Sequence, residues 1–159
     1  MPLPESTAGR LRTQLDCLPT LLAGVTPEAL ERHPLPGQWS AREHLAHLAR
    51  YQEVFRSRLR RLQVEDRPLL PRYRAEEDPE WPWWMQREAQ EILQILRTQR
   101  ATLVQEVQKL TDSELAKTAV HPRWGPMTVV PWLEFFLLHE AHHLLAVLQR
   151  SREPAEAGK

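Results

Sequence analysis

Four stretches of the sequence place apolar residues at the three- and four-residue spacing of an amphipathic helix. They cover residues 6–24, 41–64, 84–110 and 129–150. Helices of this length are about 30–40 Å long at 1.5 Å per residue. Alternating runs of β-branched residues, which indicate strands, are almost absent. The pattern therefore predicts an all-α chain folded as a four-helix bundle.

Capping signals mark where several of these helices begin. Ser40 and Glu43 form a capping box, in which each side chain satisfies the other residue's backbone N–H. Thr128 is the expected N-cap of the last helix. Two connections also open with a threonine followed by a short helical turn, at Thr26 and Thr111. This echo predicts two similar helix–loop–helix halves.

The chain of 159 residues is suited to a single domain, which we expect over residues 1–150, with a disordered tail over 151–159. The two halves are joined by residues 66–84, which are rich in proline and tryptophan. This long loop is expected to pack on the bundle rather than hang free. Its tryptophans are more typical of such packing than of a substrate wall; they are Trp81, Trp83 and Trp84.

Composition excludes several classes of function. The 21 basic residues balance the 21 acidic residues, whereas nucleic-acid-binding proteins usually carry a basic excess. The sequence has no signal peptide and no apolar run of 18 residues, so no membrane span is expected. Its one cysteine, Cys17, fits a reducing compartment and is expected in the core rather than as a reactive thiol. The expected location is the cytoplasm.

The last predicted helix carries two histidines in its apolar seam. His139 and His143 follow Trp132 and Phe136 at helical spacing, and Val147 continues the seam. A buried imidazole costs about 1–3 kcal/mol unless it finds a partner. Histidines four residues apart can point at the same spot. They are either metal ligands or core histidines that are hydrogen-bonded to neighbouring helices.

Residues 139–143, HEAHH, also match the H-E-x-x-H pattern of zinc proteases. The surrounding sequence argues against a protease, because no further histidine follows and no sheet is predicted to bind an extended peptide. Glu140 stands one position from His139, so we expect it to lie off the seam. It is interpreted as a solvated helix residue rather than a catalytic base.

Two motifs together resemble the DinB/YfiT-like superfamily of small four-helix bundles. The first is W-S-A-R-E-H-L-A-H-L at 39–48, and the second is G-P-M-T at 125–128 leading into H-E-A-H-H-L at 139–144. The resemblance extends from the first helix to about residue 150. It implies up-down-down-up topology with a long crossover. It also implies a divalent metal bound by one histidine of the second helix and two of the fourth.

Carried onto this sequence, the implied metal ligands are His47, His139 and His143, and the metal is most often zinc or nickel. His44 and His142 are then expected to be neighbours that support the ligands. The two remaining histidines stand in predicted loops and are interpreted as surface residues; they are His33 and His121.

The resemblance also implies an activity. Characterised members of the superfamily include thiol S-transferases that use low-molecular-weight thiols, a thiol-dependent isomerase and hydrolases. We therefore expect a metal-dependent enzyme that activates a thiol or water to act on a small-molecule substrate, with a low-molecular-weight thiol as an additional cofactor. The alternative is a non-catalytic, stress-associated bundle whose metal site is structural or empty.

A homodimer is expected as well, because the last helix has more apolar residues than one face needs. The surplus consists of Val129, Val130, Leu133, Leu137, Leu144 and Leu148. Arginines gather near the end of the second helix, where cations complement the helix dipole; they are Arg56, Arg58, Arg60, Arg61 and Arg67. We interpret them as a solvated helix end, and the alternative is that they bind an anionic substrate or cofactor.

Overall fold

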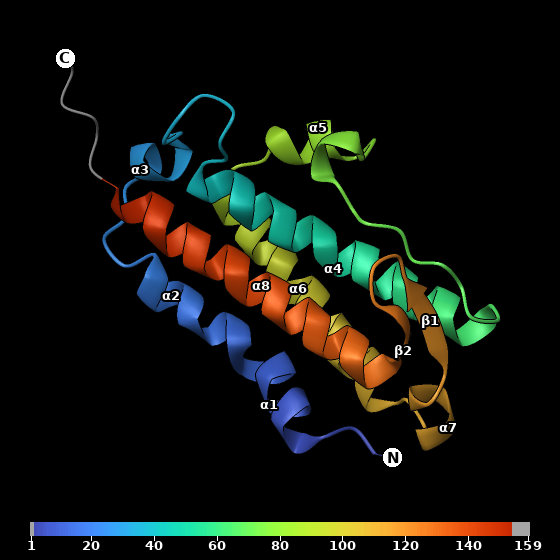
Figure 1. The fold of residues 1–159 in the computed structure, drawn as a ribbon. Coiled ribbons are helices and arrows are strands. Elements are labelled where there is room, and N and C mark those ends of the chain that lie inside the picture. Colours follow the sequence, from blue (N-terminus) through green and yellow to red (C-terminus); the bar gives the residue numbers. More distant parts are fainter. Residues whose placement is uncertain (1, 154–159) are drawn as a thin grey trace.

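The computed structural model describes residues 2–153 (Figure 1). In chain order the elements are α1 (Glu5–Thr13), η1 (Gln14–Cys17), α2 (Leu18–Leu21), α3 (Pro27–Glu31), α4 (Ala41–Val64), η2 (Ala75–Glu77), α5 (Trp81–Met85), α6 (Ala89–Gln108), α7 (Asp112–Leu115), β1 (Thr118–His121), β2 (Gly125–Thr128) and α8 (Val129–Arg152).

The predicted four-helix bundle and its topology are confirmed. The first helix position is filled by α1, η1 and α2 together, and the others by α4, α6 and α8 (Figure 1). The helices α4 and α6 run in the same direction. Glu53 of α4 contacts Gln99 of α6, and Arg56, farther along α4, contacts Glu106, farther along α6. A long crossover over residues 65–88 joins them. The outer two helices run the opposite way, which gives up-down-down-up.

The first helix is not continuous, although its periodicity runs through residues 6–24. A 3₁₀ segment, Gln14–Cys17, separates α1 from α2. Pro19 lies in the first turn of α2. A proline has no N–H and its ring clashes with the carbonyl four residues earlier, so the α-helical ladder cannot run through this point.

The third helix begins later than the sequence suggests. The short helix α5 ends at Met85, and α6 starts at Ala89 after a cap at Glu88 in extended conformation. Trp84 is fully buried and belongs to the core cluster formed with α4 and α8. The break at residues 86–88 therefore separates α5, which carries this buried side chain, from α6.

The predicted caps have the expected positions. The Ser40 hydroxyl accepts from the Glu43 N–H at 3.2 Å, and the Glu43 carboxylate accepts from the Ser40 N–H at 2.7 Å. Thr111 forms a second capping box at α7, and Thr26 caps α3. Thr128 is the N-cap residue of α8, but its side chain makes no capping hydrogen bond.

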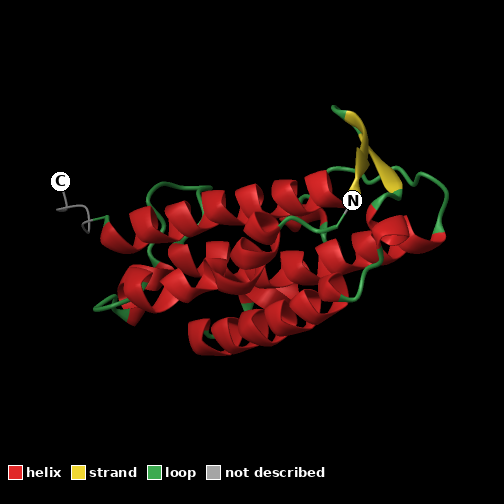
Figure 2. Cartoon of the chain, turned by 90° about the horizontal axis from the view of Figure 1, so that it is seen from below, coloured by secondary structure: helices red, strands yellow, loops and turns green. Residues whose placement is uncertain are grey.

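One element was not expected. The strands β1 and β2 pair antiparallel as a hairpin, which Figure 2 shows projecting from one end of the bundle. Gly125 at the turn has φ +73°, a conformation that side chains disfavour. A bridge between Leu69 and Val120 ties the hairpin to the crossover. Each strand has only four residues, too few for an alternating pattern to stand out.

The apolar surplus predicted for the last helix is mostly used inside the chain. Val129, Leu133, Leu137 and Leu144 are buried in the bundle core, while Val130 and Leu148 are half-buried. The large apolar side chains that α8 does expose are different ones, Leu138 at 65% and Leu145 at 53%. These core residues are therefore not available for a dimer interface, and the apolar surplus they represent is no argument for a dimer.

The end of the chain differs slightly from the expected boundary. The helix α8 continues to Arg152, and Ser151 is buried. Residues 154–159 of the predicted tail lie outside the described residues. Among the described helices none is long and apolar enough to cross a membrane.

Candidate metal centre

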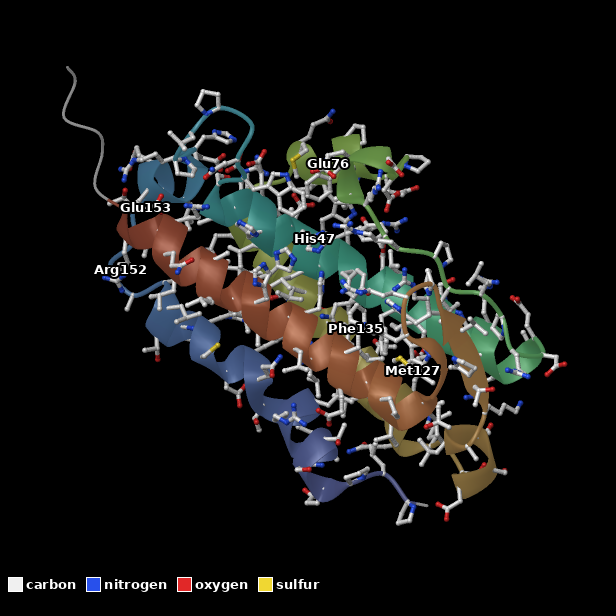
Figure 3. All side chains as sticks on the ribbon, in the orientation of Figure 1. His47, Glu76, Met127, Phe135, Arg152 and Glu153 are labelled. Carbon is white, nitrogen blue, oxygen red and sulfur yellow. The ribbon has the colours of Figure 1, made fainter. Side chains whose placement is uncertain are left out.

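Three imidazoles from two antiparallel helices converge on one point. The Nε2 atom of His139 on α8 lies 3.2 Å from Nε2 of His47 on α4 and 3.1 Å from Nε2 of His143 on α8. A ligand atom from each of the three lies within 4.8 Å of the others. Figure 3 shows His47 along the seam between α4 and α8.

Burial keeps these imidazoles neutral. His47 is 4% exposed and His143 9% exposed, and His139 is half-buried. Desolvation, followed by the nearby imidazoles, lowers the pKa of His47 to about 3 and that of His143 to about 2. Burial likewise lowers the pKa of His139 to about 4. Each ring therefore offers a nitrogen lone pair at neutral pH, which is the form that binds metal.

The spacing of the nitrogens fits a metal ion. An ion bound tetrahedrally at 2.0–2.1 Å from each imidazole places its nitrogen ligands about 3.3 Å apart. The alternative of hydrogen-bonded core histidines is less complete, because Nε2 of His139 contacts two other ring nitrogens. A neutral ring nitrogen carries either one proton or one lone pair, so this atom cannot form a full hydrogen bond with both. The donor set therefore suits a divalent cation better than a closed hydrogen-bond network.

His44 supports the cluster, as the resemblance implied. Its Nδ1 lies 2.9 Å from Nδ1 of His143. When Nε2 of His143 is unprotonated, its proton is on Nδ1 and donates to His44, which fixes the tautomer that presents Nε2 to a metal. Burial, with a contribution from Arg150, lowers the pKa of His44 to about 4, so this ring is a neutral acceptor. His142 is exposed, and its ring packs 5.2 Å from that of His143.

Aromatic rings enclose the three histidines. Trp39 packs 5.1 Å from the His47 ring, and Tyr51 lies 4.3 Å from the His139 ring. Tyr73 of the crossover stacks on His47 and donates its hydroxyl proton to Asp78 at 2.8 Å. These rings pack around the imidazoles, and all three also line the cavity beside them.

The cluster opens into a cavity of about 440 Å³ between α4, α8, the crossover and the hairpin. All three histidines line it, together with Arg58, His121 and residues of the segment 70–76. Figure 3 shows Phe135 on α8 and Glu76 on the crossover, both of which belong to its wall. The volume is sufficient for a small molecule.

The tryptophans of the crossover do not line this cavity. Trp84 is buried in the core, Trp81 packs 5.3 Å from Trp39, and Trp83 is partly exposed beneath Arg87. Trp84 and Trp81 are packing residues, as the sequence interpretation expects, whereas Trp83 lies at the surface. Trp39, just before α4, is the tryptophan that lines the cavity.

Glu140 corrects the sequence interpretation, because it is not solvated. It is 1% exposed and forms an ion pair with Arg100, which is itself buried. Gln52 donates to the same carboxylate at 3.0 Å, and Gln14 donates to its other oxygen at 2.9 Å. The carboxylate thus points into the core between all four helices. The sequence did contain a signal for the burial of Glu140, since it follows Phe136 by four residues and so lies on the same buried face of α8.

His121 is a second correction. It was interpreted as a surface residue, but β1 places it half-buried in the wall of the cavity. Its Nδ1 accepts from the backbone N–H groups of Arg123 at 3.1 Å and Trp124 at 3.2 Å. No sequence signal places this hairpin beside α8. His33, in contrast, is exposed as expected, and lies 2.9 Å from Glu43.

The arginines near the end of α4 divide into two groups. Arg56 pairs with Glu106 and Arg61 pairs with Glu65, while Arg60 and Arg67 are exposed. Arg58 differs, since it faces the cavity. It follows Tyr51 by seven residues and His47 by eleven, which is the spacing of a shared helix face and a signal the sequence contained.

Cys17 is half-buried and packs against the core, and its thiol donates to the Gln14 carbonyl at 3.1 Å. Burial is the largest effect on this thiol and raises its pKa, and the negative charges of Glu140 and Asp16 raise it further. A raised pKa disfavours the reactive thiolate. The expectation that Cys17 is a packing residue is consistent with this environment.

Comparison with known proteins identifies the family. The family model of the DinB superfamily matches residues 10–147. The chain belongs to the DinB superfamily. The match includes α4 and α8 up to Val147, and so all three converging histidines.

Two solved structures of this fold resemble the DinB-like chain. YfiT from Bacillus subtilis, described as a probable metal-dependent hydrolase with an unusual four-helix bundle topology, superimposes with a TM-score of 0.77 at 19% identity, over 93% of this chain and 85% of YfiT. TT2238, described as a four-helix bundle protein, superimposes with a TM-score of 0.63 at 28% identity, over 91% of this chain and 98% of TT2238. A comparison with curated proteins gave no match.

Proposed function

We propose that this DinB-superfamily protein is a metal-dependent enzyme that acts on a small molecule. His47, His139 and His143 bind one divalent metal ion, and the substrate occupies the adjoining cavity of about 440 Å³. Three imidazole ligands suit zinc and nickel, among other transition metals. The description of YfiT as a probable metal-dependent hydrolase supports the same class of chemistry.

The observation that carries this proposal is the open side of the histidine cluster. Structural zinc sites are closed by four protein ligands, whereas catalytic sites have three and leave a position for water or substrate. Among the described residues, the group of possible ligands contains three histidines and no fourth side chain. These histidines line the cavity, so a substrate group can reach the remaining position.

A divalent ion held by neutral imidazoles supplies Lewis-acid chemistry, which lowers the pKa of a water or thiol that coordinates to it. The protein's own residues prepare the site. His44 fixes the tautomer of His143, and Trp39 and Tyr73 pack against the His47 ring and fix its position. Glu140 has no part as a base, because Arg100 and the core glutamines occupy its carboxylate.

The nucleophile is either a thiol or water. Use of a low-molecular-weight thiol as co-substrate makes the protein a thiol S-transferase, and use of water makes it a hydrolase. The free cysteine of the chain is half-buried at Cys17, away from the cavity lining, so a thiol nucleophile comes from a small molecule.

The test compares both reactions on one preparation. Protein stripped with a chelator and reloaded with zinc or nickel is assayed for addition of glutathione or cysteine to a chromogenic electrophile, and for hydrolysis of chromogenic esters and amides. The proposal expects one of these activities to depend on the metal and to be lost in His47→Ala. His33→Ala is the matched control, because His33 is exposed and outside the cluster.

An absence of both activities in protein that carries its metal would contradict the enzymatic proposal. It would favour the alternative of a non-catalytic bundle with a structural metal.

A further inference from the structure

The cavity beside the three histidines carries excess positive charge. Arg58, Arg72, Arg74 and Glu76 line it. Arg74 is paired with Glu77 at 2.8 Å. Within residues 2–153, neither Arg58 nor Arg72 has a carboxylate partner. Glu76 is the one acidic side chain among the described residues of this lining, so the arginines leave the wall with an excess of positive charge.

The Arg58 guanidinium is held in place by hydrogen bonds, although it forms no ion pair with a carboxylate. Its Nη1 donates to the Tyr51 hydroxyl at 2.8 Å, and its Nη2 donates to the Pro71 carbonyl at 2.5 Å. The residue is half-buried, so its charge is less screened than that of a solvated side chain. A guanidinium fixed in this way loses little further entropy when it binds an anion.

One aromatic ring connects this cation to the histidine cluster. The Tyr51 ring lies 4.3 Å from the His139 ring, and its hydroxyl accepts from Arg58. His47, Tyr51 and Arg58 share one face of α4, at spacings of four and seven residues. A single small ligand in the cavity therefore meets the histidines at one end and Arg58 at the other.

His121 adds a neutral donor to the same wall. Its Nδ1 accepts two backbone N–H groups, so the neutral ring carries its proton on Nε2. The ring stacks on Trp124 at 4.1 Å, which fixes its orientation. The charged and neutral donors of this wall suit an acceptor-rich group such as a carboxylate or phosphate.

We infer that the ligand of this cavity is a small anionic molecule whose carboxylate or phosphate pairs with Arg58, while its other end reaches the three histidines. The end at the histidines rests on the proposed function, since it presupposes a bound metal. The anion-binding end is a property of Arg58 and its surroundings and can be tested without metal.

The first experiment isolates the anion. Zinc-free full-length protein is titrated calorimetrically at low salt with succinate, and with uncharged succinamide as the matched ligand. Wild type is expected to bind succinate at least tenfold more tightly than succinamide. Arg58→Met is expected to lose this preference, whereas Arg60→Met, an exposed arginine of the same helix, is expected to retain it. Circular dichroism checks that each variant folds.

The second experiment adds the metal end. Zinc-loaded protein is titrated with mercaptosuccinate and with 2-mercaptoethanol, and the zinc content of each sample is measured. The preference for the anionic thiol is expected to be at least tenfold in wild type and Arg60→Met, and lower in Arg58→Met. Arg58→Lys, which keeps the charge but not the fork of donors, is expected to fall between them.

The two ideas fail in different ways. Protein that binds no zinc contradicts the proposed function, and the succinate titration still decides the anion site. Equal affinity for succinate and succinamide, or equal affinity of Arg58→Met and wild type for succinate, overturns the inference, whatever the zinc content.

Discussion

At the scale of single residues, the segment His139–His143 contains two opposite environments. The histidines face α4 and the cavity, while Glu140 faces the core. The same five letters that match a protease motif thus divide between a candidate metal site and a buried ion pair. This division follows from the helix, because successive residues are turned by about 100°.

The buried pair of Glu140 and Arg100 predicts a large effect of one substitution. Glu140→Gln keeps the size of the side chain but leaves the Arg100 charge unpaired in the core, which is expected to cost about 3 kcal/mol of unfolding free energy. Urea denaturation measures the loss. Glu134→Gln on the same helix is the control: Glu134 pairs with partly exposed Arg10, so its loss is expected to be below about 1 kcal/mol. Equal losses of unfolding free energy in the two variants would contradict the assignment of Glu140 and Arg100 as a buried ion pair.

The depressed histidine pKa values predict a pH dependence for the metal-free protein. In the unfolded chain His47 and His139 protonate near pH 6.5, but in the folded chain only near pH 3 and 4. Below pH 6.5 the unfolded state therefore binds more protons. Stability is fully present above pH 6.5 and falls toward pH 4, by about 1.4 kcal/mol per pH unit for each group.

Denaturation of chelator-treated protein at pH 7, 6, 5 and 4 measures this loss, and the His47→Gln/His139→Gln variant is expected to lose less over the same range. A stability that stays flat from pH 7 to pH 5 would show that these imidazoles protonate normally in the folded state.

At the scale of elements, the start of α4 positions the first histidine of the cluster. Ser40→Ala removes the hydroxyl that caps the helix and is expected to cost about 1 kcal/mol. Thr128→Ala at the start of α8 is the matched control, because its side chain makes no capping bond, and it is expected to cost less than about 0.5 kcal/mol. Thermal or urea unfolding of the two variants gives the comparison, and a larger loss for Thr128→Ala would contradict it.

Local signals predicted the elements that depend on local chemistry. The spacing of apolar residues and the Ser40 capping box are properties of neighbouring residues, so α4 could be placed from sequence. The hairpin could not, because its short strands are held by the crossover through Val120 and Leu69. For the same reason the site residue His121 was missed, whereas Arg58 was grouped with the other arginines of its helix end, for which anion binding was only the alternative.

At the scale of the whole molecule, the bundle brings residues 92 positions apart together at His47 and His139. The parallel pair α4 and α6 requires the long crossover, and this crossover supplies one wall of the cavity. Topology and site are therefore linked, since a simple up-and-down bundle has no segment that crosses this face. The expected homodimer stays a prediction, and Leu138 and Leu145 are the apolar side chains that α8 leaves exposed.

The central claim is that the three histidines hold a metal ion, and metal content tests it most directly. Untagged protein purified without chelator is measured by plasma mass spectrometry beside His139→Ala/His143→Ala and the control His142→Ala. The account predicts about one divalent metal per chain in wild type and in His142→Ala, and none in the double variant. Wild-type protein that contains no metal and takes up neither zinc nor nickel would contradict it, and the histidines would then be core residues.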